Sequence, residues 1–153
     1  MQRMPDVRVW RTANEYQESA TILLESGKGW SAAILAALAL EIYLKSFLSQ
    51  EVKIELEGDI FQTFKKTQRG HGLVDLFKRI PREFQDELLT EYSNLGYEHT
   101  LLERLERYNN LFFDARYFHE QNPITFVDNL VVKLAKDFRY LVANISKSEN
   151  SVN

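Results

Sequence analysis

The sequence predicts an all-α protein: an antiparallel bundle of four long helices with one or two short helices. Apolar residues recur at helical spacing along most of the chain, which is typical of amphipathic helices packed around one core. Strand patterns do not alternate with helical ones, so no nucleotide-binding sheet is expected. Only three prolines and six glycines interrupt the 153 residues. We therefore expect a single domain over residues 1–145, followed by a flexible polar tail over residues 146–153.

The first two predicted helices lie in the N-terminal third of the chain. Thr12 and Glu15 have the spacing of a capping box, in which each side chain bonds a free backbone N–H group at a helix start. Gly27 suits the end of this helix. The second helix begins near Trp30 and is apolar on nearly all sides along its first turns. Such a pattern is typical of the most buried helix of a bundle.

Residues 51–69 interrupt the helical pattern. The segment "VKIELE" alternates apolar and charged residues, and Gly58–Asp59 would turn the chain back, so we expect a short hairpin or an extended loop. Helical spacing then returns, and Pro81 suits the first turn of a further helix that carries Phe84 and Leu88.

Two long helices complete the predicted bundle. The first runs from about Thr100 to Glu120, and Thr125 caps the second. Each presents one continuous apolar stripe, so each is expected to bury one face. The expected stripes are Leu101, Leu105, Tyr108, Phe112 and Ala115 in the first, and Val127, Leu130, Val131, Leu134, Phe138, Leu141 and Ile145 in the second.

The composition narrows the classes of function. A formal net charge of −3 argues against a protein that coats nucleic-acid phosphates with basic surface. The chain has no cysteine, which excludes disulfides, thiol catalysis and cysteine-ligated zinc. The three histidines lack metal-ligand spacing, so no metal and no other cofactor is expected. The sequence shows neither a signal peptide nor a membrane-spanning run, so we expect a cytoplasmic protein that does not associate with a membrane.

The segment "DARYFHE", residues 114–120, gathers the most suggestive polar side chains. At about 100° per residue, His119 continues the core stripe of its helix, and Arg116 lies at the apolar edge. One interpretation is structural, with His119 hydrogen-bonded at a helix C-terminus. Arg116 then pairs with Glu120 or Glu41. The other interpretation is functional: the arginine binds a phosphate group and the imidazole moves a proton.

Two other positions also allow two interpretations. Glu41 and Lys45 have the spacing of an ordinary ion pair within one helix. Alternatively, they lie at the end of the core, where Lys45 helps to build a charged cluster. His71 lies between two glycines just before a helix, where an anion would meet free backbone N–H groups, but it fits a helix cap equally well. The candidate ligand-binding or rim residues are Lys45, Glu41, His71, Tyr117, Glu120 and Arg107.

Three segments occur in the order "LALEIYLKSFL", "GHGLVDLF" and "FFDARYFHE". Together they resemble the HEPN superfamily of small α-helical bundles, which includes prokaryotic toxins, phage-defence proteins and partners of nucleotidyltransferases. The resemblance spans about residues 12–145 and implies a bundle that commonly dimerises. In active members it further implies a metal-independent ribonuclease, with an arginine and a histidine at the dimer cleft.

The sequence departs from the nuclease signature of that superfamily. Active members carry the histidine roughly four to six positions after the arginine, whereas His119 directly follows Arg116-Tyr117-Phe118. No histidine follows Arg107 at the required distance. The segment "ARYFHE" instead resembles the arginine–tyrosine ending of non-nucleolytic members, which implies packing or ligand binding.

The sequence therefore leads to one main expectation and two alternatives. The main expectation is a HEPN-like domain that forms a homodimer and binds a nucleotide or RNA phosphate, or a protein partner such as a nucleotidyltransferase-like protein. The setting would be a toxin–antitoxin or phage-defence system. The alternatives are a metal-independent ribonuclease that uses Arg116 and His119, and a non-catalytic helical adaptor. The sequence leaves open whether the protein is an enzyme.

Overall fold

The computed structural model describes residues 4–48, 72–111 and 129–150. These ranges contain helices and no strand, so the described part of the chain is all-α, as predicted. The expected hairpin or loop at 51–69 lies outside them. No helix in the three ranges is both long enough and apolar enough to cross a membrane. The helices are α1 (Val7–Glu25), α2 (Gly29–Lys45), α5 (Leu73–Arg79), α6 (Arg82–Ser93), α7 (Leu101–Arg107) and α10 (Leu130–Asn150).

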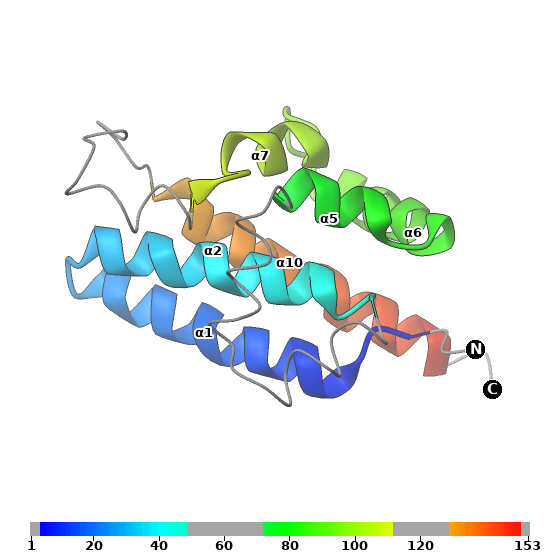
Figure 1. The fold of residues 1–153 in the computed structure, drawn as a ribbon, viewed down its shortest axis with the longest axis horizontal. Helices are drawn as coiled ribbons and strands as arrows, with labels where there is room; N and C mark the ends of the chain where they lie inside the picture. The colour runs from blue at the N-terminus through cyan, green and yellow to red at the C-terminus, as the bar shows by residue number, and fades with distance from the viewer. Residues whose placement is uncertain (1–3, 49–71, 112–128, 151–153) are drawn as a thin grey trace.

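The three longest described helices form one group, and the shorter helices lie over it (Figure 1). Helices α1 and α2 form an antiparallel hairpin, and α10 packs against both. Helix α5 contacts α2 and α7, while α6 contacts α10. Helices α5, α6 and α7 therefore cover one side of the group, at the top of Figure 1.

Helix α1 begins after Asp6 rather than at Thr12. The Asp6 carboxylate accepts a hydrogen bond from Arg8 N at 3.0 Å and caps the helix. The predicted capping box of Thr12 and Glu15 is therefore wrong. Thr12 lies inside the helix, where its hydroxyl donates to the Arg8 carbonyl at 3.0 Å.

The predicted end of α1 at Gly27 is confirmed. Gly27 has φ of 78°, a left-handed conformation that glycine adopts without steric cost. Gly27 N donates to Leu24 O at 3.0 Å, and Lys28 N donates to Leu23 O at 2.8 Å. These two bonds form a Schellman motif, which satisfies the last carbonyls of α1 and reverses the chain into α2.

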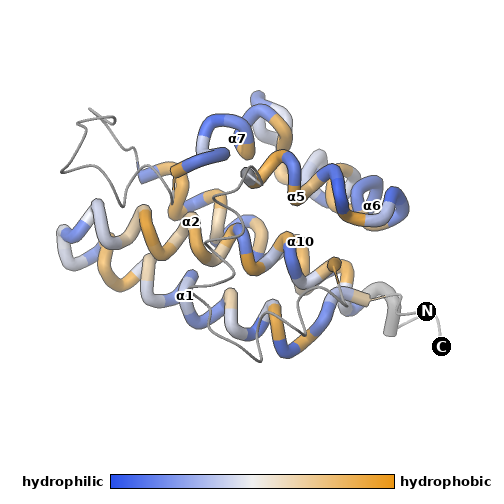
Figure 2. The backbone as a smooth tube through the Cα atoms, in the orientation of Figure 1, coloured by the Kyte–Doolittle hydropathy of each residue, from blue (hydrophilic) through white to orange (hydrophobic). Residues whose placement is uncertain are grey.

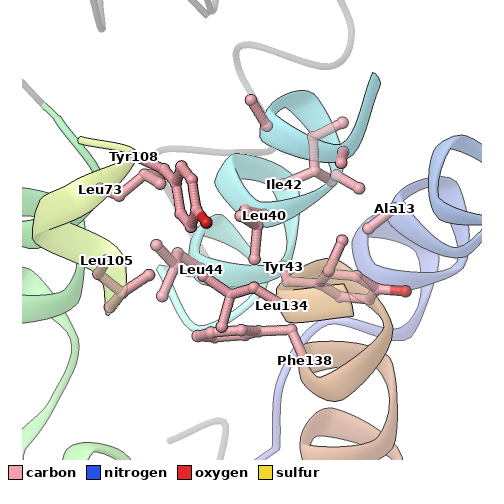
Figure 3. Packing of buried hydrophobic residues seen from close by; sticks show 14 of the residues in the cluster. Ala13, Leu40, Ile42, Tyr43, Leu44, Leu73, Leu105, Tyr108, Leu134 and Phe138 are labelled. Carbon is pink, nitrogen blue, oxygen red and sulfur yellow. The ribbon is translucent and has the colours of Figure 1, made fainter. Parts of the chain in front are cut away.

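Helix α2 is the central helix, as its composition predicts. Every residue from Ala36 to Lys45 is buried, and Figure 2 shows apolar residues along most of its length. Its alanines give α1 and α10 room to approach closely. Figure 3 shows how the larger side chains pack on both sides of α2. Leu40 and Leu44 face Leu73, Leu105 and Tyr108, while Tyr43 lies near Ala13, Leu134 and Phe138.

Tyr43 links the three long helices. Its ring stacks on Phe138 of α10 with centroids 6.5 Å apart, and its hydroxyl donates to Asn14 Oδ1 of α1. The side chain is fully buried, and burial raises the pKa of its phenol well above the ordinary value. Tyr43 therefore fills the core as a neutral phenol with a hydrogen-bond partner.

Helix α10 confirms most of its predicted stripe. Leu130 is the exception: it is 55% exposed, because it begins the helix at the surface. The predicted cap at Thr125 and the stripe residue Val127 lie outside the described residues. The helix continues to Asn150, through the first residues of the expected tail. The confirmed buried residues are Val131, Leu134, Phe138, Leu141 and Ile145.

The helix predicted from Thr100 begins where expected but is interrupted. Thr100 and Glu103 form a reciprocal capping box, yet α7 ends at Arg107 and a turn follows. Asn109 in this turn bonds another helix: its carbonyl accepts from Leu73 N at 3.4 Å, and its side chain accepts from Val74 N at 2.9 Å. The turn residue thus caps α5 instead of continuing α7.

The part of the predicted stripe that falls in this region is nevertheless buried as expected. It consists of Leu101, Leu105 and Tyr108. Phe112 and Ala115 lie outside the described residues.

Candidate functional site

Most residues singled out from the sequence lie outside the described ranges. These are the two candidate catalytic residues and three of the rim candidates: Arg116, His119, His71, Tyr117 and Glu120. Glu41, Lys45 and Arg107 lie within the ranges. Glu41 and Lys45 lie together, whereas Arg107 lies elsewhere.

Glu41 and Lys45 form an ion pair in the last turns of α2. Lys45 Nζ lies 3.3 Å from Glu41 Oε1, at the spacing the sequence predicts. The pair lies at the buried end of the core rather than on a solvated face, since Glu41 is 2% and Lys45 6% exposed. Breaking a buried ion pair is strongly destabilising, so the pair constrains the core around it.

Arg107 lines a pocket of about 360 Å³. Glu41 and Lys45 do not line this pocket. Three stretches of chain contribute to this pocket: the turn that follows α6, helix α7, and the first turn of α10. Pockets of this volume are typical of small-molecule sites. The lining residues are Tyr97, Glu98, His99, Glu103, Arg104, Arg107, Tyr108, Leu130 and Lys133.

One wall of the pocket is built around Arg104. Arg104 Nη1 donates to Asp137 Oδ2 of α10 at 3.0 Å and to the Tyr92 hydroxyl at 3.4 Å. The side chains of Arg104 and Asp137 are 13% and 14% exposed. Burial by itself lowers the pKa of Arg104, but the hydrogen bonds to Tyr92 and Asp137 outweigh it, so that pKa is raised above its ordinary value. Arg104 is therefore a fixed, fully charged group.

Tyr97 is held against this wall. Its ring stacks on Tyr92 with centroids 5.6 Å apart, and the guanidinium carbon of Arg104 lies 4.4 Å from its centroid. Burial is the largest cause that raises the pKa of Tyr97, and a hydrogen bond to Asp137 adds to the rise. Tyr97 therefore remains a neutral, positioned aromatic at neutral pH.

Lys133 completes the basic side of the pocket. Its Nζ lies 5.2 Å from the Tyr97 ring centroid, and the residue is exposed on α10. Arg107, also exposed, lies on the facing helix α7. The pocket thus presents two solvent-facing cations beside aromatic and apolar surface from Tyr108 and Leu130. This arrangement can hold an anionic group next to a ring.

Two carboxylates lie in the same lining. Glu103 Oε2 accepts from Thr100 N at 3.0 Å and is 3.5 Å from His99 Nδ1, so the start of α7 holds it in place. Glu98 is exposed in the preceding turn. Within the described ranges, no three His, Cys, Asp or Glu side chains are grouped so as to hold a metal ion. The chemistry that these lining residues support is recognition of a charged ligand.

Little in the sequence predicts this pocket. Arg107 was a candidate, but Tyr97, Arg104 and Lys133 belong to three stretches that come together only in the fold. The T-x-x-E pattern at Thr100 was the one available local signal, because it places a helix start beside the "GYEH" turn. Comparison of the chain with known proteins gave no match to a family model, a curated protein or a solved structure.

Proposed function

We propose that the protein is a helical binding module whose pocket between α7 and α10 receives a phosphate group of a nucleotide or of RNA. The observation that carries this proposal is the convergence of Arg107 and Lys133, from two separate helices, on one pocket beside Tyr97. Arginine and lysine make charge-assisted hydrogen bonds to phosphate oxygens, and these are stronger than hydrogen bonds between neutral groups.

The neighbouring surface suits the rest of such a ligand. Tyr108 and Leu130 contribute apolar lining that a nucleobase can pack against. Arg104 and Tyr97 are fixed by Asp137 and Tyr92, so ligand binding need not order these side chains. A preformed wall lowers the entropy cost of binding.

The wider setting belongs to the same proposal. The HEPN-like resemblance supports a homodimer, a nucleotidyltransferase-like partner and a toxin–antitoxin or phage-defence role. It also supports an antiparallel bundle of four long helices, of which α1, α2 and α10 would be three. A ribonuclease that uses Arg116 and His119 stays the alternative. It predicts RNA cleavage in EDTA that both Arg116→Ala and His119→Ala abolish.

A pair of lysines on one helix provides the test of phosphate binding. Lys133 lines the pocket, whereas Lys136 is also exposed on α10 but does not line the pocket. We expect Lys133→Ala to weaken binding of adenosine monophosphate about three- to tenfold, because one charge-assisted contact is lost. Lys136→Ala should leave the dissociation constant unchanged. Isothermal titration calorimetry at low salt measures both.

Two results would count against phosphate binding in this pocket. One is the absence of measurable binding by the wild-type protein at millimolar ligand. The other is equal weakening by Lys133→Ala and Lys136→Ala, since this would indicate attraction to the whole helix surface rather than to one site.

A further inference from the structure

One face of α10 carries three lysines and a tyrosine in a row. The row, called here the basic face of α10, consists of Lys133, Lys136, Tyr140 and Lys147. At about 100° per residue, these four positions fall within about 60° of one another around the helix axis. All four residues are exposed, and Tyr140 is 53% exposed.

Contacts on both sides of this face show that it points away from the bundle. By helical spacing, Asp137 lies on one side of the row, and it pairs with Arg104 of α7 at 3.0 Å. Arg139 lies on the other side, and its Nη1 is 2.7 Å from Glu18 Oε1 of α1. The basic face lies between these two contacts and is open to solvent.

The three lysines of this face keep their charge available to a ligand. Within the described ranges, no carboxylate lies within ion-pair distance of their Nζ atoms. The acids that flank the row are engaged elsewhere: Glu18 and Asp137 pair with arginines, and Glu91 of α6 accepts from Asn144 Nδ2 at 3.3 Å. Positive charges in one row favour a ligand with several negative charges. The formal net charge of −3 is compatible with a local row of this kind.

The basic face begins at the pocket and extends away from it along α10. Lys133 lines the pocket, and Lys147 lies near the other end of the same helix. At about 1.5 Å of rise per residue, the two lysines are about 21 Å apart along the axis. A stacked nucleic-acid strand rises about 3.4 Å per nucleotide, so this distance corresponds to about six nucleotides. A single nucleotide in the pocket cannot reach Lys147.

We propose that the basic face of α10 binds single-stranded RNA, with one phosphate in the pocket and further phosphates along the lysines. This inference rests on the proposed function, because it extends the ligand of the same pocket from one phosphate to a chain of them. Tyr140 favours RNA over other polyanions, since an exposed ring among lysines can stack on an unpaired base. An acidic peptide or an anionic lipid surface offers no base for this contact.

Two ligands of different length test the inference. Adenosine monophosphate occupies the pocket alone, whereas an oligoadenylate RNA of about eight nucleotides also covers the basic face. Isothermal titration calorimetry at several salt concentrations measures the association constant K of each ligand. For a single strand, each phosphate contact contributes about −0.7 to the slope of log K against log salt concentration. The three lysines should therefore contribute about −2 to the slope for the oligoadenylate.

Single variants then assign the contacts along the basic face. Lys136→Ala and Lys147→Ala should each weaken oligoadenylate binding about three- to tenfold and reduce its slope by about 0.7. Neither variant should change binding of adenosine monophosphate. Tyr140→Ala should weaken oligoadenylate binding without changing the slope, whereas Tyr140→Phe should keep wild-type affinity, because its ring can still stack. The control is Lys78→Ala, since Lys78 is exposed on α5 and belongs neither to the basic face nor to the pocket.

The outcomes separate this inference from the proposed function. If Lys136→Ala and Lys147→Ala bind oligoadenylate as Lys78→Ala does, the inference is overturned and phosphate binding in the pocket is left intact. Equal competition by an oligoglutamate peptide of the same length would overturn the assignment to RNA. If adenosine monophosphate does not bind and Lys133→Ala leaves oligoadenylate binding unchanged, the proposed function fails, and this inference fails with it. Circular dichroism and thermal unfolding confirm that each variant is folded.

Discussion

The contact between Gly72 and Asn109 yields a quantitative prediction about the stability of the fold. A Cβ atom at residue 72 would lie only 2.5 Å from both Cγ and Nδ2 of Asn109. The same amide side chain accepts a hydrogen bond from Val74 N at 2.9 Å, which caps the start of α5. Gly72→Ala must therefore displace Asn109 and break this bond. The backbone itself is no obstacle, since φ of Gly72 is −74°.

The size of the effect follows from what the displacement removes. Loss of a side-chain cap costs about 1 kcal/mol, and alanine is a poorer residue than glycine at the N-cap position itself. We expect Gly72→Ala to lower the free energy of unfolding by about 1–2 kcal/mol and Asn109→Ala to lower it by about 1 kcal/mol. Once Asn109 is truncated, the new methyl group at residue 72 has room.

A double-mutant cycle by urea denaturation measures this coupling. The combined variant should lose about 1 kcal/mol less than the sum of the single losses, because the clash and the lost cap are the same event. Gly29→Ala is the matched control, since a Cβ there would meet only Asn129 Oδ1 at an ordinary 3.4 Å. Strict additivity of Gly72→Ala and Asn109→Ala would refute the proposed contact.

Two further predictions concern α1 and the centre of the core. Asp6→Ala should lower the free energy of unfolding by about 1 kcal/mol, because Asp6 caps α1. Thr12→Ala should not lower it measurably, because Thr12 lies inside the helix and does not cap it. Equal losses for the two variants in urea denaturation would contradict this prediction. Burial raises the pKa of Tyr43 above 10.0, so the unfolded state loses this proton first. The contribution of Tyr43 to the free energy of unfolding should therefore be constant below about pH 10 and fall above it. Above about pH 10 the free energy of unfolding should fall less steeply in Tyr43→Phe than in the wild type; identical slopes would show that Tyr43 is not the group responsible.

Helix starts show why local patterns succeed at one place and fail at another. The same T-x-x-E pattern occurs at Thr12 and at Thr100, and only the second is a capping box. Before Thr12 the chain offers an earlier N-cap at Asp6, and the helical pattern extends back to it without a break. A cap is effective only where the helix has no better place to begin, so the pattern must be judged with the residues that precede it.

Helix ends show a second limit of local patterns. No pattern in the segment "ERYNNLFF" predicts that Asn109 caps a helix that begins more than thirty positions earlier in the chain. The spacing of Leu101, Leu105 and Tyr108 predicted their burial correctly because burial depends on one face of one helix. The turn at Asn109 depends on a bond between segments distant in sequence, which periodicity within one helix does not report.

The candidate site shows the same difference between contacts within one helix and contacts between distant segments. The pairing of Glu41 with Lys45 followed from their spacing, since the two residues belong to one helix. Their burial at the end of the core was one of two open interpretations, because it depends on what surrounds α2. The pocket at Tyr97 was not predicted, as its aromatic, basic and acidic residues come from three stretches that share no local motif.

The way the pocket is built limits how it can bind. Asp137 and Tyr92 already satisfy the partly buried Arg104, so this arginine orders the wall without offering its full charge to a ligand. Attraction then depends on Lys133 and Arg107, which are exposed and therefore screened by salt. Such a site should bind with modest affinity and a clear salt dependence.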